Sequence, residues 1–176
     1  MGQSDKRVAV IGRFQPFHWG HFEYLIEASL LGTQVVVGIT NPTPSQTRFS
    51  DADPTRSARE ANPFSYAERC EMIKLTMDRL ASHLDVRFAP CDLRSSGQLR
   101  ASLGQCELVA LTIYDAWGEE KMGLLRDAGY DVKVLWQRRE KITSGTEVRR
   151  RLSAGMAWEQ FVPHGTREVI RRCLSR

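Results

Sequence analysis

Two histidines three residues apart follow a short apolar segment and begin a helical pattern. The apolar segment is residues 7–11, and the chain then runs through Gly12, Arg13, Phe14 and Gln15 to His18, Gly20 and His21. Gly20 lets the main chain approach a ligand, and the unpaired N–H groups and dipole of a helix start attract anions. Two imidazoles at this spacing can both donate to phosphate oxygens. We therefore predict a phosphate site here.

A second group of polar side chains begins a helix late in the chain. Ser144 is a natural N-cap, and Glu147 completes a capping box. A cap followed by a solvated basic face would also account for this spacing. However, Ser144 and Thr146 place hydroxyls at the helix start, and Arg149 and Arg150 follow within one turn, where guanidinium groups can grip a polyphosphate.

Apolar segments alternate with helical patterns along the chain. We predict strands at residues 7–11, 34–39, 86–90, 108–113 and 132–136, and helices at 20–31, 65–83, 96–104 and 115–128. Such alternation favours an α/β fold with a five-stranded parallel sheet and helices on both faces. Shorter helical pieces at 147–154, 158–162 and 166–174 follow, so that residues 155–176 form a small helical extension. We expect one domain over residues 1–176.

The helix at residues 65–83 has the clearest signals. Ser65 and Glu68 form an S-x-x-E capping box after Pro63. One apolar stripe follows, and we predict that it faces the core: Tyr66, Cys70, Ile73, Met77 and Leu80.

A long polar loop, residues 41–61, follows the second predicted strand and holds three prolines. Loops of this length in compact domains are usually active-site lids or disordered segments. Ligands of open α/β sheets bind at the carboxyl ends of strands, which favours a lid. We expect Arg48 or Arg56 to reach an anionic group of the ligand from this loop.

Composition narrows the class of protein. The 176 residues are 41% hydrophobic, no apolar run is long enough for a membrane helix, and we expect a cytoplasmic protein. The four widely spaced cysteines favour reduced, structural thiols.

Residues 138–176 carry ten Lys/Arg against four Asp/Glu, a surplus of six positive charges. They lack an arginine–aromatic platform, which favours a small polyphosphate over nucleic acid. The oligomeric state stays open, and a homo-oligomer is compatible with the sequence.

The two phosphate motifs resemble those of a known superfamily. The H-x-G-H element at residues 18–21 and the I-x-S-x-T-x-x-R element at residues 142–149 are similar to the signature pair of the cytidylyltransferase-like nucleotidyltransferases. GRFQPFHWGH, NPFSYAER, SGTEVRRRL and WEQFVP together resemble the archaeal-type nicotinamide mononucleotide (NMN) adenylyltransferases. The resemblance implies a Rossmann-like domain, a nucleoside triphosphate donor, Mg²⁺ held mainly through the triphosphate, and direct transfer without a covalent intermediate.

The resemblance also implies roles for single residues. It makes His18, His21 and Arg149 the expected catalytic residues. The expected nucleotide-binding residues are Gly12, Arg13, Phe14, Gln15, Gly20, Ser144, Thr146 and Arg150.

Departures from the NMN enzymes fall on the acceptor side. Their short loop with a Ser-His-Thr element corresponds here to the long loop with Ser45-Gln46-Thr47, and no tryptophan follows Asp92 to stack on nicotinamide. Their Gly-Asn pair is Tyr114-Asp115 in this chain. This form is similar to nucleotidyltransferases of phosphonate pathways, which commonly use CTP. The expected acceptor-binding residues are Arg48, Arg56, Asp92, Tyr114, Asp115 and Trp117.

The sequence thus favours transfer of a nucleotidyl group, from CTP slightly more than from ATP, to a small phosphonate or phosphate. One alternative is an NMN adenylyltransferase that makes NAD. Another is a non-catalytic nucleotide sensor that has kept the fold. A tRNA-charging enzyme is disfavoured because the chain is short and lacks a K-M-S-K-S loop.

Overall fold

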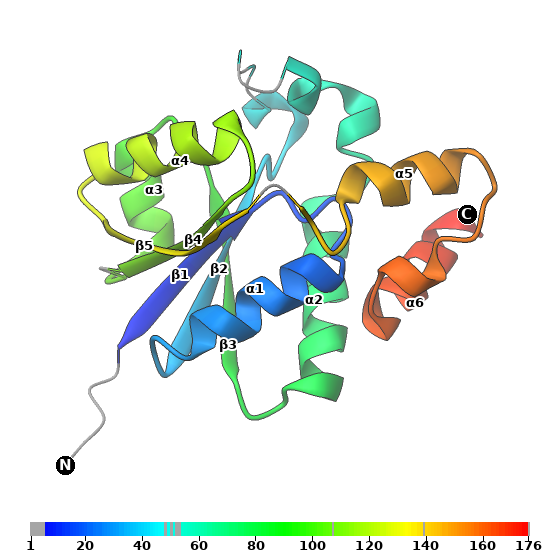
Figure 1. Cartoon of the computed structure of the whole chain (residues 1–176), viewed down its shortest axis with the longest axis horizontal. Helices are drawn as coiled ribbons and strands as arrows, with labels where there is room; N and C mark the ends of the chain where they lie inside the picture. The colour runs from blue at the N-terminus through cyan, green and yellow to red at the C-terminus, as the bar shows by residue number, and fades with distance from the viewer. Residues whose placement is uncertain are drawn as a thin grey trace.

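Five parallel strands form a single sheet. A computed structural model describes residues 6–47, 49, 51, 54–106, 108–138 and 140–175. The strands lie in the order β3-β2-β1-β4-β5 (Figure 1). Their bounds are β1 Arg7–Gly12, β2 Gln34–Thr40, β3 Asp85–Cys91, β4 Leu108–Ile113 and β5 Asp131–Gln137. The predicted Rossmann-like α/β fold is confirmed.

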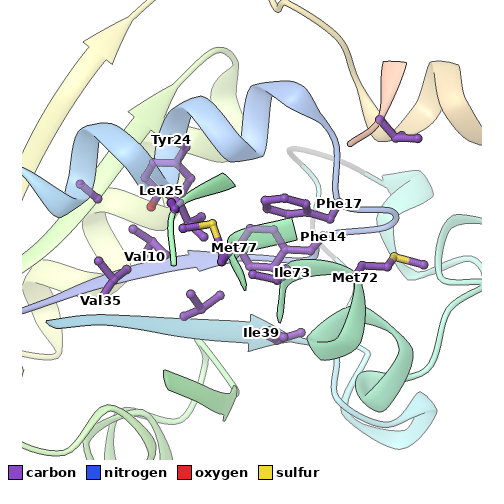
Figure 2. Packing of buried hydrophobic residues seen from close by; sticks show 14 of the residues in the cluster. Val10, Phe14, Phe17, Tyr24, Leu25, Val35, Ile39, Met72, Ile73 and Met77 are labelled. Carbon is purple, nitrogen blue, oxygen red and sulfur yellow. The ribbon is translucent and has the colours of Figure 1, made fainter. Parts of the chain in front are cut away.

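Helices cover both faces of the sheet. Along β1, Val8 and Val10 face the layer of α1 (Trp19–Ser29) and α2 (Tyr66–Leu80), whereas Ala9 and Ile11 face the other layer. That second layer contains α3 (Ser96–Leu103) and α4 (Ala116–Asp127). Successive side chains of a strand alternate between faces, and covered faces on both sides account for the continuous apolar run of the central strand. Figure 2 shows part of the first layer around Val10, Leu25 and Met77.

The C-terminal extension shares the core of the sheet. Helix α5 (Gly145–Ser153) is followed by the short 3₁₀ helix η4 (Glu159–Phe161) and by α6 (His164–Leu174), which packs against α2. Trp158, Val162, Val169 and Ile170 belong to the same buried cluster as α1 and α2. In the described part of the chain, no helix is long and apolar enough to cross a membrane.

Helix α2 begins as predicted and buries most of the predicted stripe, together with additional residues beside it. The Ser65 Oγ accepts from the Glu68 N–H, and the Glu68 carboxylate accepts from the Ser65 N–H at 2.8 Å. The predicted stripe is wrong at Leu80, which is 47% exposed, and Tyr66 and Cys70 are half-buried. The buried residues are Arg69, Met72, Ile73, Thr76 and Met77.

The side chain of Arg69 is the charged member of the buried residues of α2. It is fully buried and donates to the main-chain carbonyls of Arg13 at 2.9 Å, Thr40 at 2.7 Å and Asn41 at 2.8 Å. Carbonyls at the ends of strands need hydrogen-bond partners once they are buried. Arg69 thereby ties the ends of β1 and β2 to α2.

The loop at residues 41–61 contains three short 3₁₀ helices: η1 (Pro44–Gln46), η2 (Pro54–Ser57) and η3 (Arg59–Ala61). Its second half is fastened to the end of β1, because Arg13 Nη1 donates to the carbonyls of Arg56 at 3.1 Å and Ala61 at 3.4 Å. Asn62 Nδ2 also donates to the Arg56 carbonyl, at 2.9 Å. Arg48 lies outside the described residues.

Candidate active site

A cavity of about 460 Å³ opens at the carboxyl ends of β1 and β4. The chain leaves β1 towards β2 on one side, while β4 lies on the other, so this is the topological switch point where ligands of such sheets bind. The structure brings most of the predicted site residues together around it: Gly12, Arg13, Phe14, Gln15, His18, Gly20, His21, Arg56, Tyr114, Asp115, Trp117, Ser144, Thr146 and Arg149.

The two histidines form a stacked pair at the start of α1. His18 is the N-cap, and its Nδ1 accepts from the His21 N–H at 3.3 Å. The two rings lie 3.6 Å apart at 18°. Because Nδ1 of His18 is an acceptor, its proton is on Nε2, which is left as a donor.

Burial keeps both imidazoles neutral. It lowers the pKa of His18 to about 3, with Lys141 and Arg149 adding to the effect. The pKa of His21 lies well below its usual value, again chiefly through burial and then through His18. Phe14 and Phe17 pack against the His21 ring, with centroids 4.8 and 5.9 Å away, and Figure 2 shows both phenylalanines in the core. Neutral imidazoles in this position act as hydrogen-bond donors rather than as charges.

Two buried polar atoms beside the cavity lack partners. His21 Nδ1 and Thr143 Oγ1 have no hydrogen bond within the described residues, and both residues line the cavity. Buried polar groups in native proteins are nearly always satisfied, so orphaned ones need an explanation such as a ligand.

The second phosphate motif meets the first through Arg149. The Ser144 Oγ caps α5 by accepting from the Glu147 N–H at 3.2 Å. Arg149 donates through Nη1 to the Gln15 carbonyl and through Nη2 to Thr146 Oγ1 at 3.2 Å. Gly145 permits this contact, because a Cβ there would lie 2.6 Å from the Gln15 carbonyl oxygen. The starts of α1 and α5 thus line one cavity.

Three of the predicted nucleotide-binding side chains have other contacts. Arg150 pairs with Glu147 at 2.8 Å and is not among the residues that line the cavity. The Gln15 amide is bound to the Phe64 main chain at 2.7 and 3.0 Å, and the Phe14 ring is fully buried. Phe14 and Gln15 therefore offer the cavity mainly their main chain.

The other wall of the cavity carries the predicted acceptor residues. The Arg56 guanidinium lies over the Trp117 ring, 4.4 Å from its centroid. Asp115 caps α4 by accepting from the Gly118 N–H at 3.1 Å and pairs with Lys141 at 3.3 Å. Arg56 and Trp117 also border a recess of about 30 Å³, and Asp92 lines this recess rather than the main cavity.

Two lysines at the cavity were missed by the sequence reasoning. Lys121 is buried, and its Nζ donates to the Ile11 carbonyl at 2.8 Å. Burial, followed by the charge of Arg56, lowers the pKa of Lys121 to about 7. The signal was present, since Gly118, Lys121 and Leu125 form the buried stripe of α4 and a lysine in such a stripe is unusual. Lys141 lies in the segment after β5, where no periodicity marks it.

The cavity is strongly cationic. Among its lining residues, Asp115 is the single carboxylate, set against five cationic side chains: Arg13, Arg56, Lys121, Lys141 and Arg149. Within the described residues, no group of three His, Cys, Asp or Glu side chains could hold a metal ion. Such a cavity suits an anionic ligand.

The model of the cytidylyltransferase-like family matches residues 9–151. The chain belongs to this family. It is 35% identical to a phosphonoformate cytidylyltransferase of Streptomyces viridochromogenes over 92% of this chain and 89% of that protein. It is 28% identical to a nicotinamide-nucleotide adenylyltransferase of Thermococcus onnurineus over 94% and 82% of the two chains. This family member is accordingly a nucleotidyltransferase.

Solved structures share the fold. A bifunctional NMN adenylyltransferase/ADP ribose pyrophosphatase of Francisella tularensis, complexed with AMP and manganese, superposes with a TM-score of 0.62 at 16% identity. The match covers 96% of this chain and 49% of that one. A putative nicotinate-nucleotide adenylyltransferase of Vibrio parahaemolyticus gives a TM-score of 0.55 at 12% identity, over 94% and 99% of the two chains. At such identities the likeness concerns the fold alone.

Proposed function

We propose that this nucleotidyltransferase moves a nucleoside monophosphate, preferably from CTP, to a small phosphonate or phosphate acceptor and releases pyrophosphate. The proposal rests on one observation, a cavity that is lined on two sides by two different sets of polar groups. Two helix starts and the histidine pair form one wall, and Arg56, Lys121 and Lys141 stand on the other. The 35% identity to a phosphonoformate cytidylyltransferase supports the same acceptor class.

The donor triphosphate is assigned to the first wall. His18, His21 and Arg149 are the proposed catalytic residues, since they can donate to the α-phosphate and to the leaving pyrophosphate as its charge develops. Gly12, Arg13, Gly20, Ser144 and Thr146 would hold the phosphates, with Phe14 and Gln15 contributing main chain. Transfer of this kind depends on in-line positioning and electrostatic stabilisation rather than on a nucleophilic side chain.

Mg²⁺ fits this arrangement as a companion of the donor. The cavity offers one carboxylate, that of Asp115, and this carboxylate already caps α4 and pairs with Lys141. The ion would therefore be held mainly by triphosphate oxygens, and when bound it would neutralise part of their charge. The protein supplies the donors that orient those oxygens.

The acceptor is assigned to the second wall, at Arg56, Tyr114, Asp115 and Trp117. The recess beside Asp92 is a poor site for nicotinamide, because about 30 Å³ holds little more than a water molecule. The cationic side chains of the main cavity, Arg56 and Lys121 among them, suit a small anion. This favours a phosphonate over NMN.

A pyrophosphate-release assay tests the proposal. Wild-type protein with Mg²⁺ is offered four nucleoside triphosphates, each with phosphonoformate, methylphosphonate, a set of phosphosugars and NMN. We expect the highest kcat/KM for CTP with a phosphonate, and a value at least about tenfold lower for ATP with NMN. An NMN value of about 10⁴ M⁻¹s⁻¹ or more, with no better acceptor, would identify an NMN adenylyltransferase instead. Nucleotide binding without any pyrophosphate release would identify a sensor.

A further inference from the structure

Lys121 reaches the cavity from the opposite face of the sheet to the histidines. Helix α4 lies so close to β4 that a Cβ on Gly118 would be 3.1 Å from the Ile113 Cα. Lys121 follows three residues later on the same side of the helix. Its side chain can therefore extend past β4 to the end of β1, where Nζ donates to the Ile11 carbonyl at 2.8 Å. The ammonium group of Lys121, a residue of α4, therefore lies at the topological switch point of the sheet.

The described residues leave this buried ammonium poorly compensated. An ammonium has three donors, and one of them is used on the Ile11 carbonyl. The carboxylate whose charge acts on Lys121 is that of Asp115, whose side chain is 53% exposed and already paired with Lys141. Burying a charge without a close partner is unfavourable, which argues that a ligand completes the site.

The groups that face Lys121 from neighbouring elements are mainly cationic or neutral. Arg56 faces it from η2, His21 from α1 and Asp115 from the start of α4. Burial and Arg56 lower the pKa of Lys121 to about 7, and Asp115 opposes them. An anion placed between Lys121 and Arg56 would reverse this balance, because a nearby negative charge favours the protonated form of Lys121.

We propose that Lys121 binds the anionic oxygen of the acceptor that attacks the α-phosphate. The inference rests on the proposed function. The donor phosphates are assigned to the starts of α1 and α5, whereas Lys121 lies with Arg56, Trp117 and Asp115 on the facing wall. In the step, the acceptor oxygen forms a bond to the α-phosphorus, and the bond from that phosphorus to the bridging oxygen breaks. The electron pair leaves with pyrophosphate. Lys121 keeps its proton and positions the attacking oxygen.

Substitutions separate this role from simple packing. Lys121→Met keeps the length of the side chain without its charge, and Lys121→Arg keeps the charge. Lys74→Met is the control, because Lys74 is 64% exposed on α2, away from the cavity. We expect Lys121→Met to raise the KM for phosphonoformate about 10- to 100-fold, the range for losing a charged hydrogen bond. The affinity for CTP should stay within about twofold, and Lys121→Arg should recover part of the loss.

Calorimetry provides a readout that packing alone would not change. Phosphonoformate is titrated into protein saturated with α,β-methylene-CTP at pH 7.5, in two buffers of different ionisation enthalpy. With a pKa of about 7, Lys121 is only partly protonated before binding. Wild type should take up more protons on binding than Lys121→Arg, since Lys121 becomes fully protonated beside the anion whereas arginine is already protonated at this pH. This comparison holds even if Lys121→Met fails to fold.

The outcomes are distinct. An active wild type whose Lys121→Met and Lys121→Arg variants match it in acceptor KM and in proton uptake would overturn the role of Lys121 and leave the proposed function standing. A wild type that releases no pyrophosphate with any donor and acceptor would overturn the proposed function itself.

Discussion

Burial determines the protonation state of the histidine pair. His18 and His21 stack at 3.6 Å, and a positive charge on either ring would be close to the other and to Arg149. Both rings are therefore neutral, and the donor on His18 is on its Nε2. Neutral donors stabilise the charge that develops on phosphate oxygens without needing a proton from solvent.

Replacing His21 by alanine should affect turnover far more than stability. Removal of one preorganised donor typically lowers the rate about 10²- to 10³-fold. His83→Ala, at an exposed position, is the matched control. We expect a folded protein by circular dichroism with the reduced kcat for His21→Ala, and wild-type kcat for the control. Wild-type turnover by folded His21→Ala would remove His21 from the proposed catalytic residues.

The depressed pKa of His18 predicts loss of stability in mild acid. In the folded protein His18 stays neutral down to about pH 3, whereas in the unfolded chain it takes up a proton below about 6.5. The unfolded state therefore binds more protons between these values, and stability falls as the pH falls through this window. At pH 5.5 His18 lowers the free energy of unfolding by about 1.4 kcal/mol relative to neutral pH. His21 lowers it further, since its pKa is also depressed.

Urea unfolding of wild type and His18→Asn at pH 7.5 and 5.5 measures this effect. Asparagine is a good N-cap and does not titrate, so it keeps the start of α1 while removing the proton. The variant should lose about 1.4 kcal/mol less than wild type between the two pH values. Equal losses in the two proteins would show that His18 titrates normally.

At the scale of elements, the strands, the helices and the helix starts that carry the two motifs were predictable from sequence, because each rests on local signals. The β-branched strands and the capping residues Ser65 and Ser144 determine local conformation by themselves. Arg150 shows where such reasoning stops. Successive helix residues point about 100° apart, so Arg149 and Arg150 could not both face one cavity, and Glu147 pairs with the second.

Strand order was not predictable in the same way. Asp92 follows β3, which is an edge strand two places from β1. Neighbouring strands lie about 4.8 Å apart, so Asp92 is displaced from the switch point by roughly 10 Å. Nothing in the local sequence reports this lateral offset. The same holds for Lys121, whose cavity position depends on how α4 packs on β4.

The contact between the two motifs gives a prediction at Gly145. Gly145→Ala would place a Cβ 2.6 Å from the Gln15 carbonyl oxygen and 3.1 Å from Arg149 Nη1, so the start of α5 must move away from the loop after β1. We expect CTP affinity to fall at least about tenfold and stability to fall by about 1–3 kcal/mol.

Gly123→Ala is the matched control for Gly145→Ala. Gly123 lies within α4, where an added Cβ would meet nothing within 4 Å. That change should leave CTP binding unaltered and stabilise the helix slightly. Calorimetric titration with CTP and urea unfolding compare the two variants. If Gly145→Ala binds CTP like wild type, the tight contact between the motifs is not needed for the donor site.

At the scale of the whole molecule, the basic C-terminal segment is largely paired within the chain. Arg172 pairs with Glu71 of α2, and Arg171 contacts Glu159 at 3.5 Å. Within this segment Arg151 lies over Phe161, 4.6 Å from the ring centroid, a single contact rather than a platform of arginine and aromatic side chains. That pair connects α5 with the extension and does not line the cavity. Of the charged residues of α5, Arg149 is the one that lines the cavity.

Because the extension completes the core, its removal should unfold the protein. A chain that ends at Ala154 loses Trp158, Val162, Val169 and Ile170 from the main buried cluster. Burial of such side chains contributes about 1.5–3 kcal/mol each, so their sum approaches the whole stability of a typical domain. We expect the truncated chain to lack a cooperative thermal transition by circular dichroism.

Two substitutions on α6 refine this test. Ile170 is fully buried, and Ile170→Ala should cost about 2–5 kcal/mol. Leu174 is 67% exposed on the same helix, and Leu174→Ala should change stability by less than about 0.5 kcal/mol. A cooperatively folded truncated chain, or equal costs for the two substitutions, would mean that the extension is dispensable.

The way Arg13 holds the long loop bears on substitutions at residue 56. The Arg13 guanidinium donates hydrogen bonds to the main-chain carbonyl oxygens of residues 56 and 61, and the Asn62 side chain also donates to the carbonyl of residue 56. Because these hydrogen bonds involve main-chain oxygens, they do not depend on which side chain residue 56 has. Substitutions at residue 56 would therefore leave the loop attached to Arg13, and they would not change the side of the cavity to which the donor triphosphate is assigned. Under the proposed function, a change of residue 56 would therefore alter the acceptor side of the cavity while leaving the loop and the donor side in place.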